Sequence, residues 1–217
     1  MARNVFISFR YADGYKYKEE LASLFDASED TVDYSEDEDR SRMSESSIQK
    51  FLYGKLKRSS VTIMLLTPKA IDYHTKTRIN PQTFRYETVF DDWVYDEIRY
   101  SLEERDGNAT NGLIAVYTPE AEPYLLTETV HYCDVCKHAS TIKSIISRNN
   151  LVYNNMMNVK PEFKRHKCIN VYDGDYDSYC SLVAYDEFKK KFGDYIDKAY
   201  QKRNELYKYK LCKRLYP

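Results

Sequence analysis

Val61-Thr62-Ile63-Met64-Leu65-Leu66 is the stretch that decides the fold class of this 217-residue chain. Six uncharged, mostly apolar residues that end at Thr67-Pro68 are typical of a strand buried on both faces of a parallel sheet. The other strand candidates are residues 5–9, 31–34, 113–117 and 168–172. Stretches with helical spacing follow most of them. The sequence therefore predicts an α/β fold with about five parallel strands and helices on both faces.

Helical and irregular stretches divide the rest of the chain. Apolar residues recur at helical spacing in 17–25, 46–58, 92–105 and 186–211. The stretches expected to be loops or irregular are 10–14, the densely charged 35–42, and 69–91. The pattern weakens over 120–165, which is typical of an insertion or a long functional loop. We expect one domain over 1–217, with the insertion at 120–165 before the last strand and a C-terminal helical segment at 186–217.

The composition excludes several classes of protein. Lys and Arg number 33 against 34 Asp and Glu, so no general nucleic-acid surface is expected. The chain has no run of about 18 apolar residues, and its start lacks a signal peptide's apolar region. We therefore expect a cytoplasmic protein that has no membrane partner. Five scattered cysteines fit reduced thiols. No Gly-x-Gly-x-x-Gly motif or phosphate-binding P-loop is present, which argues against a Rossmann dehydrogenase and an NTPase.

The predicted helix that begins near residue 92 carries the main candidate for a functional acid. Its buried stripe is Val94, Ile98 and Leu102, and the residues expected to face water are Asp92, Asp96, Arg99 and Glu103. Glu97 lies at the border of the stripe, one turn after Trp93. A carboxyl group beside an indole ring can face a cleft where its pKa is tuned, although an ordinary solvated glutamate fits the same pattern.

Several stretches of the chain resemble TIR domains. Val5-Phe6-Ile7-Ser8-Phe9-Arg10 looks like their first strand and loop, and the charged loop after Tyr34 stands where TIR domains have the BB loop. Trp93-Val94-Tyr95-Asp96-Glu97-Ile98 resembles the Trp-Val-x-x-Glu-Ile pattern of NAD-cleaving members. The stretches 182–188 and 195–200 resemble TIR-like proteins of the ThsB type, from the bacterial Thoeris anti-phage defence system. The resemblance covers roughly 4–118 and 168–203.

The resemblance implies a flavodoxin-like fold and an enzyme that consumes NAD+ as its substrate, with no further cofactor. Glu97 would be the catalytic residue that contacts the ribose hydroxyls while the bond to nicotinamide breaks. ThsB-type members are understood to rejoin the ribosyl cation internally, which gives a cyclic ADP-ribose isomer. That signal would activate a ThsA-like effector that depletes NAD+. Self-association is a further expectation, because many TIR domains act by assembling with one another.

The chemistry fits the residues named by the resemblance. Loss of nicotinamide passes through an oxocarbenium-like state, which a carboxylate at the ribose hydroxyls stabilises. No general acid is required because the leaving group is already cationic. The other expected substrate-binding residues are Phe9, Arg10, Tyr34, Ser35 and Trp93. Arg10 would pair with the pyrophosphate, although a surface arginine is an equal alternative. Phe9 and Trp93 are also compatible with places in the core.

A second group of residues has the types that ligate zinc. His131, Cys133, Cys136 and His138 lie close together in the sequence, and His166 and Cys168 follow later. A structural zinc ion would tie down the insertion. However, a Cys-x-x-Cys pair is common by chance, and no second pair accompanies it. The catalytic site is therefore expected to hold no metal, and structural zinc remains an alternative.

Two other functions remain open. A non-enzymatic TIR-like interaction module would have the same fold, because a fold does not prove a function. A nucleoside or nucleotide glycosidase on a related scaffold is the third interpretation. An acid at position 97 beside a tryptophan favours an enzyme, since an adaptor needs neither residue.

Overall fold

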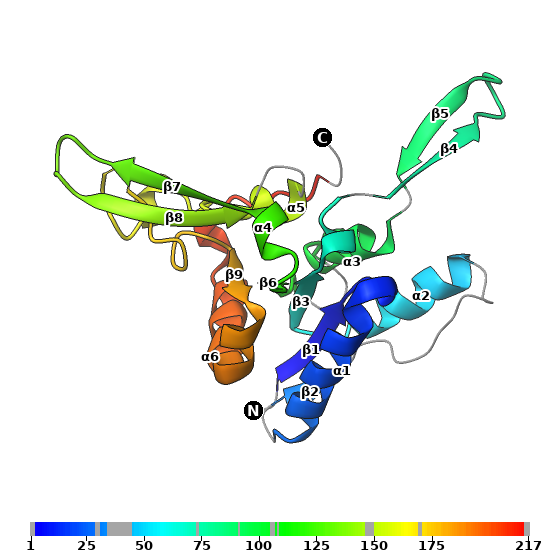
Figure 1. Cartoon of the computed structure of the whole chain (residues 1–217), viewed down its shortest axis with the longest axis horizontal. Coiled ribbons are helices and arrows are strands. Elements are labelled where there is room, and N and C mark those ends of the chain that lie inside the picture. Colours follow the sequence, from blue (N-terminus) through cyan, green and yellow to red (C-terminus); the bar gives the residue numbers. More distant parts are fainter. Residues whose placement is uncertain are drawn as a thin grey trace.

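The structure is a computed structural model that describes residues 3–28, 31–33, 45–72, 74–90, 92–104, 107, 109–145, 150–168 and 171–214. Its centre is a five-stranded, wholly parallel sheet with the strand order β2-β1-β3-β6-β9 (Figure 1). The strands are β1 (Arg3–Ser8), β2 (Thr31–Asp33), β3 (Val61–Leu66), β6 (Gly112–Tyr117) and β9 (Cys180–Ala184). The predicted α/β, TIR or flavodoxin-like fold class is confirmed.

Four long helices cover the two faces of the sheet. They are α1 (Tyr11–Asp26), α2 (Glu45–Leu56), α3 (Trp93–Ser101) and α6 (Tyr185–Asn204). Val61, Ile63 and Leu65 of β3 pack in one apolar cluster with residues of α1 and α6. Met64 and Leu66 alternate to the opposite face and pack with residues of α3. This alternation explains why all six β3 residues are buried, as the sequence predicts.

The close approach of α6 to the sheet explains one glycine. A Cβ atom placed on Gly112, at the start of β6, would lie 2.2 Å from the backbone oxygen of Ala199 in α6. That distance is far below van der Waals contact. Gly112 is therefore required for α6 to pack this closely against the middle of the sheet.

Two antiparallel hairpins project from the sheet as arms (Figure 1). One is β4 (Thr75–Ile79) with β5 (Tyr86–Phe90), and the other is β7 (Leu126–Tyr132) with β8 (Ala139–Ile145). The shorter elements are α4 (Glu122–Leu125), α5 (Asn150–Tyr153) and the 3-10 helices η1 (Pro68–Ala70), η2 (Pro161–Phe163) and η3 (Leu206–Lys208). The stretch 120–165 thus contains the β7–β8 hairpin together with α4, α5 and η2.

Two stretches predicted to lack regular structure form the start of a helix and a β-hairpin. The predicted loop at 10–14 is wrong, because α1 begins at Tyr11. Contacts with other elements hold its first turn: Asp13 bonds to residues that follow β3, and Gly14 packs against Phe9. The irregular segment at 69–91 contains the β4–β5 hairpin. Every residue of β4 is exposed, so the sequence carries no apolar alternation that would indicate the strand.

The last strand and two helix ends also differ from the prediction. No strand forms in the described residues of 168–172, and the fifth strand of the sheet is β9. Tyr172 instead lies beside the β7–β8 hairpin, where its backbone N–H donates to Ser140 Oγ at 3.4 Å. Helix α3 ends at Ser101 rather than near 105, and α6 ends at Asn204 rather than near 211. After η3 the chain turns back and pairs with Val159 through Tyr209.

Candidate functional site

The candidate site lies at the edge of the sheet where β1 and β3 end. In open parallel sheets, ligands bind beyond the carboxyl ends of the strands. Ser8 is the last residue of β1, and Thr67 follows β3. Polar side chains from α1 and α3 meet these two residues. The site is therefore built from elements that are distant in the sequence.

Glu97 points into this edge and is buried. Its side chain is on α3, and the residue is 7% exposed. Ser8 Oγ donates a hydrogen bond to Glu97 Oε2 at 2.6 Å, and Ser8 itself is 1% exposed. Glu97, expected at the border of the apolar stripe, is therefore buried and accepts a hydrogen bond from Ser8. The solvated-glutamate interpretation is wrong for this residue.

Burial changes the protonation of Glu97. Desolvation raises the pKa of its carboxyl group to about 8, and the negative charges of Asp96 and Asp92 act in the same direction. The hydrogen bond from Ser8 and the charge of Arg10 oppose the rise. The neutral acid therefore predominates at pH 7. A cation bound nearby would favour the carboxylate, because opposite charges lower the pKa of an acid.

Arg10 and Asp92 form a buried ion pair beside Glu97. The Arg10 guanidinium pairs with the Asp92 carboxylate, and their side chains are 11% and 0% exposed. Asp92 is the N-cap of α3, and its Oδ2 accepts a 2.7 Å bond from the backbone N–H of His74. The expectation that Asp92 faces water is wrong, because these donors hold it inside. Arg10 also donates to the carbonyl oxygen of Lys69 at 3.2 Å.

Two further contacts fix the edge of the sheet. Asp13 accepts a 2.7 Å bond from Thr67 Oγ1 and a 2.8 Å bond from the backbone N–H of Lys69. Arg10 holds the N-cap position of α1, and Asp13 in the first turn joins α1 to η1. Tyr95 is fully buried and donates to the carbonyl oxygen of Ile71 at 3.0 Å. Together these bonds attach α1 and α3 to the end of β3.

Of the other predicted substrate-binding residues, two are half-buried and two lie outside the described part of the chain. Phe9 is half-buried and packs against the apolar cluster under α1. Trp93 is half-buried and packs against the cluster of Phe6, Leu52 and Leu56. Both side chains thus have apolar neighbours. Tyr34, Ser35 and the charged loop 35–42 lie outside the described residues.

Sequence reasoning missed several residues of this site. Ser8 contacts Glu97 directly, and Asp92 pairs with Arg10 beside it. Thr67 and Tyr95 make hydrogen bonds that attach α1 and α3 to the end of β3. One signal was available for Ser8, because it is a polar residue inside an otherwise apolar strand run. Asp92 precedes a helix and is a typical N-cap type, but its pairing with Arg10 depends on the fold.

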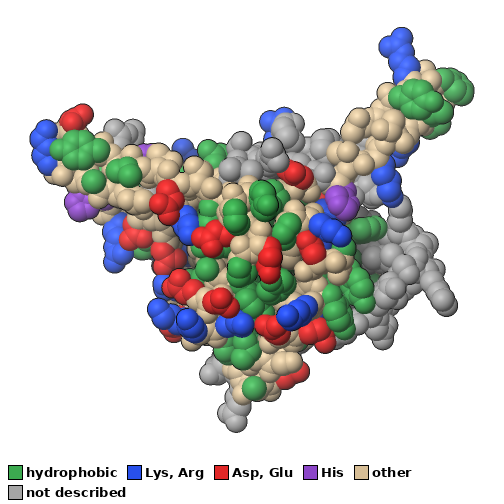
Figure 2. All heavy atoms as spheres, in the orientation of Figure 1, with side chains coloured by type: hydrophobic (Ala, Val, Ile, Leu, Met, Phe, Trp, Pro, Cys, Tyr) green, Lys and Arg blue, Asp and Glu red, His purple; other side chains and the backbone are tan. Residues whose placement is uncertain are grey.

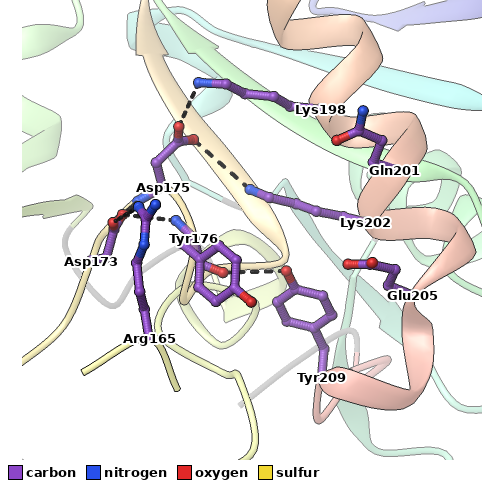
Figure 3. Close-up of a pocket in the computed structure, with 9 residues that line it drawn as sticks. All are labelled: Arg165, Asp173, Asp175, Tyr176, Lys198, Gln201, Lys202, Glu205 and Tyr209. Carbon is purple, nitrogen blue, oxygen red and sulfur yellow. Dashed lines mark hydrogen bonds and ion pairs between the residues drawn. The ribbon is translucent and has the colours of Figure 1, made fainter. Parts of the chain in front are cut away.

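A separate hollow of about 330 Å³ lies near the amino end of β9 (Figure 3). Asp175 accepts a 2.7 Å bond from Lys198, and Lys202 reaches toward it from the same helix. Burial lowers the pKa of Lys202 to about 8, and this amine also donates to Ser181 Oγ at 2.9 Å. Because this hollow precedes β9, it lies at the opposite edge of the sheet from Ser8 and is distinct from the predicted site.

The residues named as possible zinc ligands lie at a third location, on the β7–β8 arm. Cys133 and Cys136 lie in the turn of the hairpin, and the thiol sulfurs of Cys133, Cys136 and Cys168 lie within 4.8 Å of one another. His138 stacks on His166, with ring centroids 5.0 Å apart. His131 faces Tyr172. These residues are remote in the fold from β1 and α3.

Comparison with known families agrees with this architecture. Residues 6–76 match the family model described as the Thoeris protein ThsB, TIR-like domain. The match supports a ThsB-like TIR-domain protein. The matched part runs from β1 into β4 and covers about a third of the chain, including Ser8, Phe9 and Arg10 but not Glu97. No curated protein matches the chain.

The match to the ThsB family model is a likeness over residues 6–76. It covers the strand and loop on one side of the site, and α3 supplies the other side. Within the described part of the chain, no helix is long and apolar enough to cross a membrane.

Proposed function

We propose that this protein cleaves NAD+ between the ribose and nicotinamide, with Glu97 as the catalytic carboxylate. The observation that carries the proposal is the buried contact between Glu97 Oε2 and Ser8 Oγ at the carboxyl edge of the sheet. It places one acid with a strongly raised pKa where ligands of this fold class bind.

The chemistry requires the carboxylate form of Glu97. The C–N glycosidic bond breaks with its electron pair moving to the nicotinamide nitrogen, which leaves a cation on the ribose. A carboxylate that accepts from the ribose hydroxyls stabilises this cation, and more strongly in a dry site. The positive nicotinamide ring of bound NAD+ favours ionisation of Glu97. Ser8 orients the carboxylate by donating to one of its oxygens.

The proposal includes the fate of the cation and the partner of the product. An internal hydroxyl group of the ADP-ribosyl cation adds to the ribose carbon and loses its proton to solvent, giving a cyclic ADP-ribose isomer. That product would act as a signal for a ThsA-like NAD+-consuming effector, so the effector is an indirect partner. NAD+ is the substrate and no other cofactor takes part. Self-association through the TIR-like fold is compatible with this scheme.

The competing proposal is a TIR-like interaction module without activity. The matched segment stops before α3, so the family match alone does not reach the acid. Arg10, expected to bind the pyrophosphate, is paired with Asp92 in this structure. The Arg10–Asp92 pair is the observation that favours a module, and product analysis decides between the two proposals.

Chromatography of NAD+ incubated with the protein tests the proposal. The protein is assayed in lysate from phage-challenged cells, because activity in this kind of system is expected to need an infection trigger. Wild type and the control Glu104→Gln, an exposed glutamate near the end of α3, should release nicotinamide and form a cyclic product. Glu97→Gln should leave NAD+ intact. If wild type also leaves NAD+ intact, the enzyme proposal fails.

A further inference from the structure

Three thiols meet at the outer part of the β7–β8 arm. Cys133 follows β7, Cys136 lies in the turn before β8, and Cys168 comes from the segment after η2. Their sulfur atoms lie within 4.8 Å of one another. The cluster thus joins two parts of the chain that the sequence separates widely. Such a convergence of thiols from a Cys-x-x-Cys turn and a third, distant cysteine is typical of a zinc site.

The turn that carries two of the thiols is fixed by its own backbone. The N–H of Cys133 donates to the carbonyl oxygen of His138 at 2.9 Å, and the N–H of Lys137 donates to the carbonyl oxygen of Cys133 at 2.7 Å. Lys137 has a φ of +57°, a left-handed conformation that is uncommon for a residue with a side chain. The chain turns sharply after Cys136 and holds it near Cys133.

Two histidines lie close to these cysteines in the sequence, because His138 follows Cys136 by two residues and His166 precedes Cys168 by two. His138 and His166 stack with ring centroids 5.0 Å apart. The backbone N–H of Cys168 lies 3.3 Å from His166 Nδ1, which therefore accepts this bond. In the neutral ring the other nitrogen of His166 then carries the proton and cannot ligate a metal. His138 is the better candidate for a fourth ligand, although its ring nitrogens lie outside the group formed by the three sulfurs and the ring must turn toward the ion to bind it.

The β7–β8 arm buries little apolar surface of its own. Five of the seven residues of β7 are exposed. Val130 and Tyr132 are among them, at 68% and 50%, and Val135 in the turn is 90% exposed. Figure 2 shows hydrophobic side chains at the outer end of this arm. A two-stranded hairpin with so little buried apolar surface is marginally stable in water. Small units of this kind are commonly held by a disulfide or a metal.

A metal ion would bind all three thiols of this cluster, whereas a disulfide would engage only two. A disulfide would pair two of the three sulfurs and leave the third without a role. One zinc ion accepts three thiolates and one imidazole in a tetrahedral set. The segment that carries Cys168 already lies along the hairpin, because Tyr172 packs against His131 and Lys164 lies over the Tyr172 ring. A bound ion would complete an existing contact.

We propose that Cys133, Cys136 and Cys168 bind one zinc ion as thiolates, with His138 as the fourth ligand. The three thiols release their protons to solvent on binding. The ion attaches the tip of the β7–β8 hairpin to the segment at 164–168. Its role is structural, since it lies away from Ser8 and Glu97, and the proposal does not depend on NAD+ cleavage.

Zinc content and cobalt substitution test the proposal on the full chain. Protein purified under reducing conditions and dialysed against zinc should contain one zinc ion per chain by elemental analysis. Cobalt in its place should give the thiolate charge-transfer and visible bands of a tetrahedral site. Cys168→Ser should lose the ion, whereas the control Cys212→Ser, at a cysteine outside the cluster, should keep it. Zinc-free wild type, or full retention of zinc by Cys168→Ser, would overturn the proposal.

Two further measurements distinguish the ligands from a folding defect. A chelator added to folded wild type should speed amide hydrogen exchange in 126–145 and leave exchange in β3 unchanged. His138→Ala should weaken zinc affinity by at least about tenfold, and His166→Ala should weaken it less. Equal exchange with and without zinc would refute a structural role. Loss of zinc only in His166→Ala would refute the assignment of His138.

Discussion

Replacing Glu97 with glutamine should make the protein more stable, by an amount that grows with pH. The change removes the proton equilibrium of one buried carboxyl group and keeps a side chain of the same shape. The pKa of Glu97 is raised from 4.5 to about 8, chiefly by burial. The folded protein therefore binds this proton more tightly than the unfolded chain does. Below pH 4.5 the carboxyl group is protonated in both states, so it contributes no difference.

The magnitude follows from these two pKa values. As pH rises above 4.5, the unfolded chain ionises while the folded protein does not, and the free energy of unfolding falls until pH reaches the folded pKa. The lost stability is ~1 kcal/mol at pH 5, ~3 kcal/mol at pH 7 and ~5 kcal/mol at pH 9. Glutamine does not titrate. The stability advantage of Glu97→Gln should thus grow by ~4 kcal/mol between pH 5 and pH 9.

Thermal unfolding followed by circular dichroism measures this effect. For a chain of this size, 1 kcal/mol shifts Tm by about 2–4 °C, so the advantage in Tm should grow by roughly 8–16 °C over that pH range. Glu104→Gln removes the same charge from an exposed position and should follow wild type at every pH. A Tm difference for Glu97→Gln that stays constant with pH would show that Glu97 ionises normally. The argument from burial would then be refuted.

Three other substitutions test the supports of the site by chemical denaturation. Arg10→Ala should lower the free energy of unfolding by about 3 kcal/mol, because it leaves the fully buried Asp92 carboxylate unpaired; a loss below about 1 kcal/mol would show that the pair is solvated. Gly112→Ala should cost about 1–3 kcal/mol or prevent folding, since the new Cβ would meet the backbone of α6; an unchanged midpoint would contradict the packing. Tyr95→Phe should cost about 1 kcal/mol by removing the bond to the carbonyl after η1, and a neutral result would mean that this bond is replaced.

The central strands were predictable because burial on both faces leaves a strong signal. The bounds of β3 agree with the apolar run at 61–66, and β6 begins one residue before its run. The last strand was not predictable in this way. Residues 168–172 and 180–184 are both short and largely apolar, and only pairing with β6 selects the second. The β4–β5 hairpin left no signal, since both faces of β4 meet water.

The site was predictable only where one helix defines it. The wheel of α3 singled out Glu97, because its position borders the stripe of Val94, Ile98 and Leu102. The partners of the site come from other elements. Ser8 meets Glu97 and Arg10 meets Asp92 only after β1 and α3 pack side by side, so neither spacing nor composition indicates these pairs. The same holds for the approach of Cys168 to the Cys-x-x-Cys turn.

The most direct test of the account is kcat/KM for release of nicotinamide from NAD+, measured against pH for wild type and Glu97→Gln. The assay uses lysate of phage-challenged cells diluted into buffers between pH 6 and pH 9. If the carboxylate of Glu97 is the active form, wild-type kcat/KM should rise about tenfold per pH unit and level off above a pH of about 8. Glu97→Gln, although more stable, should release none. Equal release by both proteins would contradict the account.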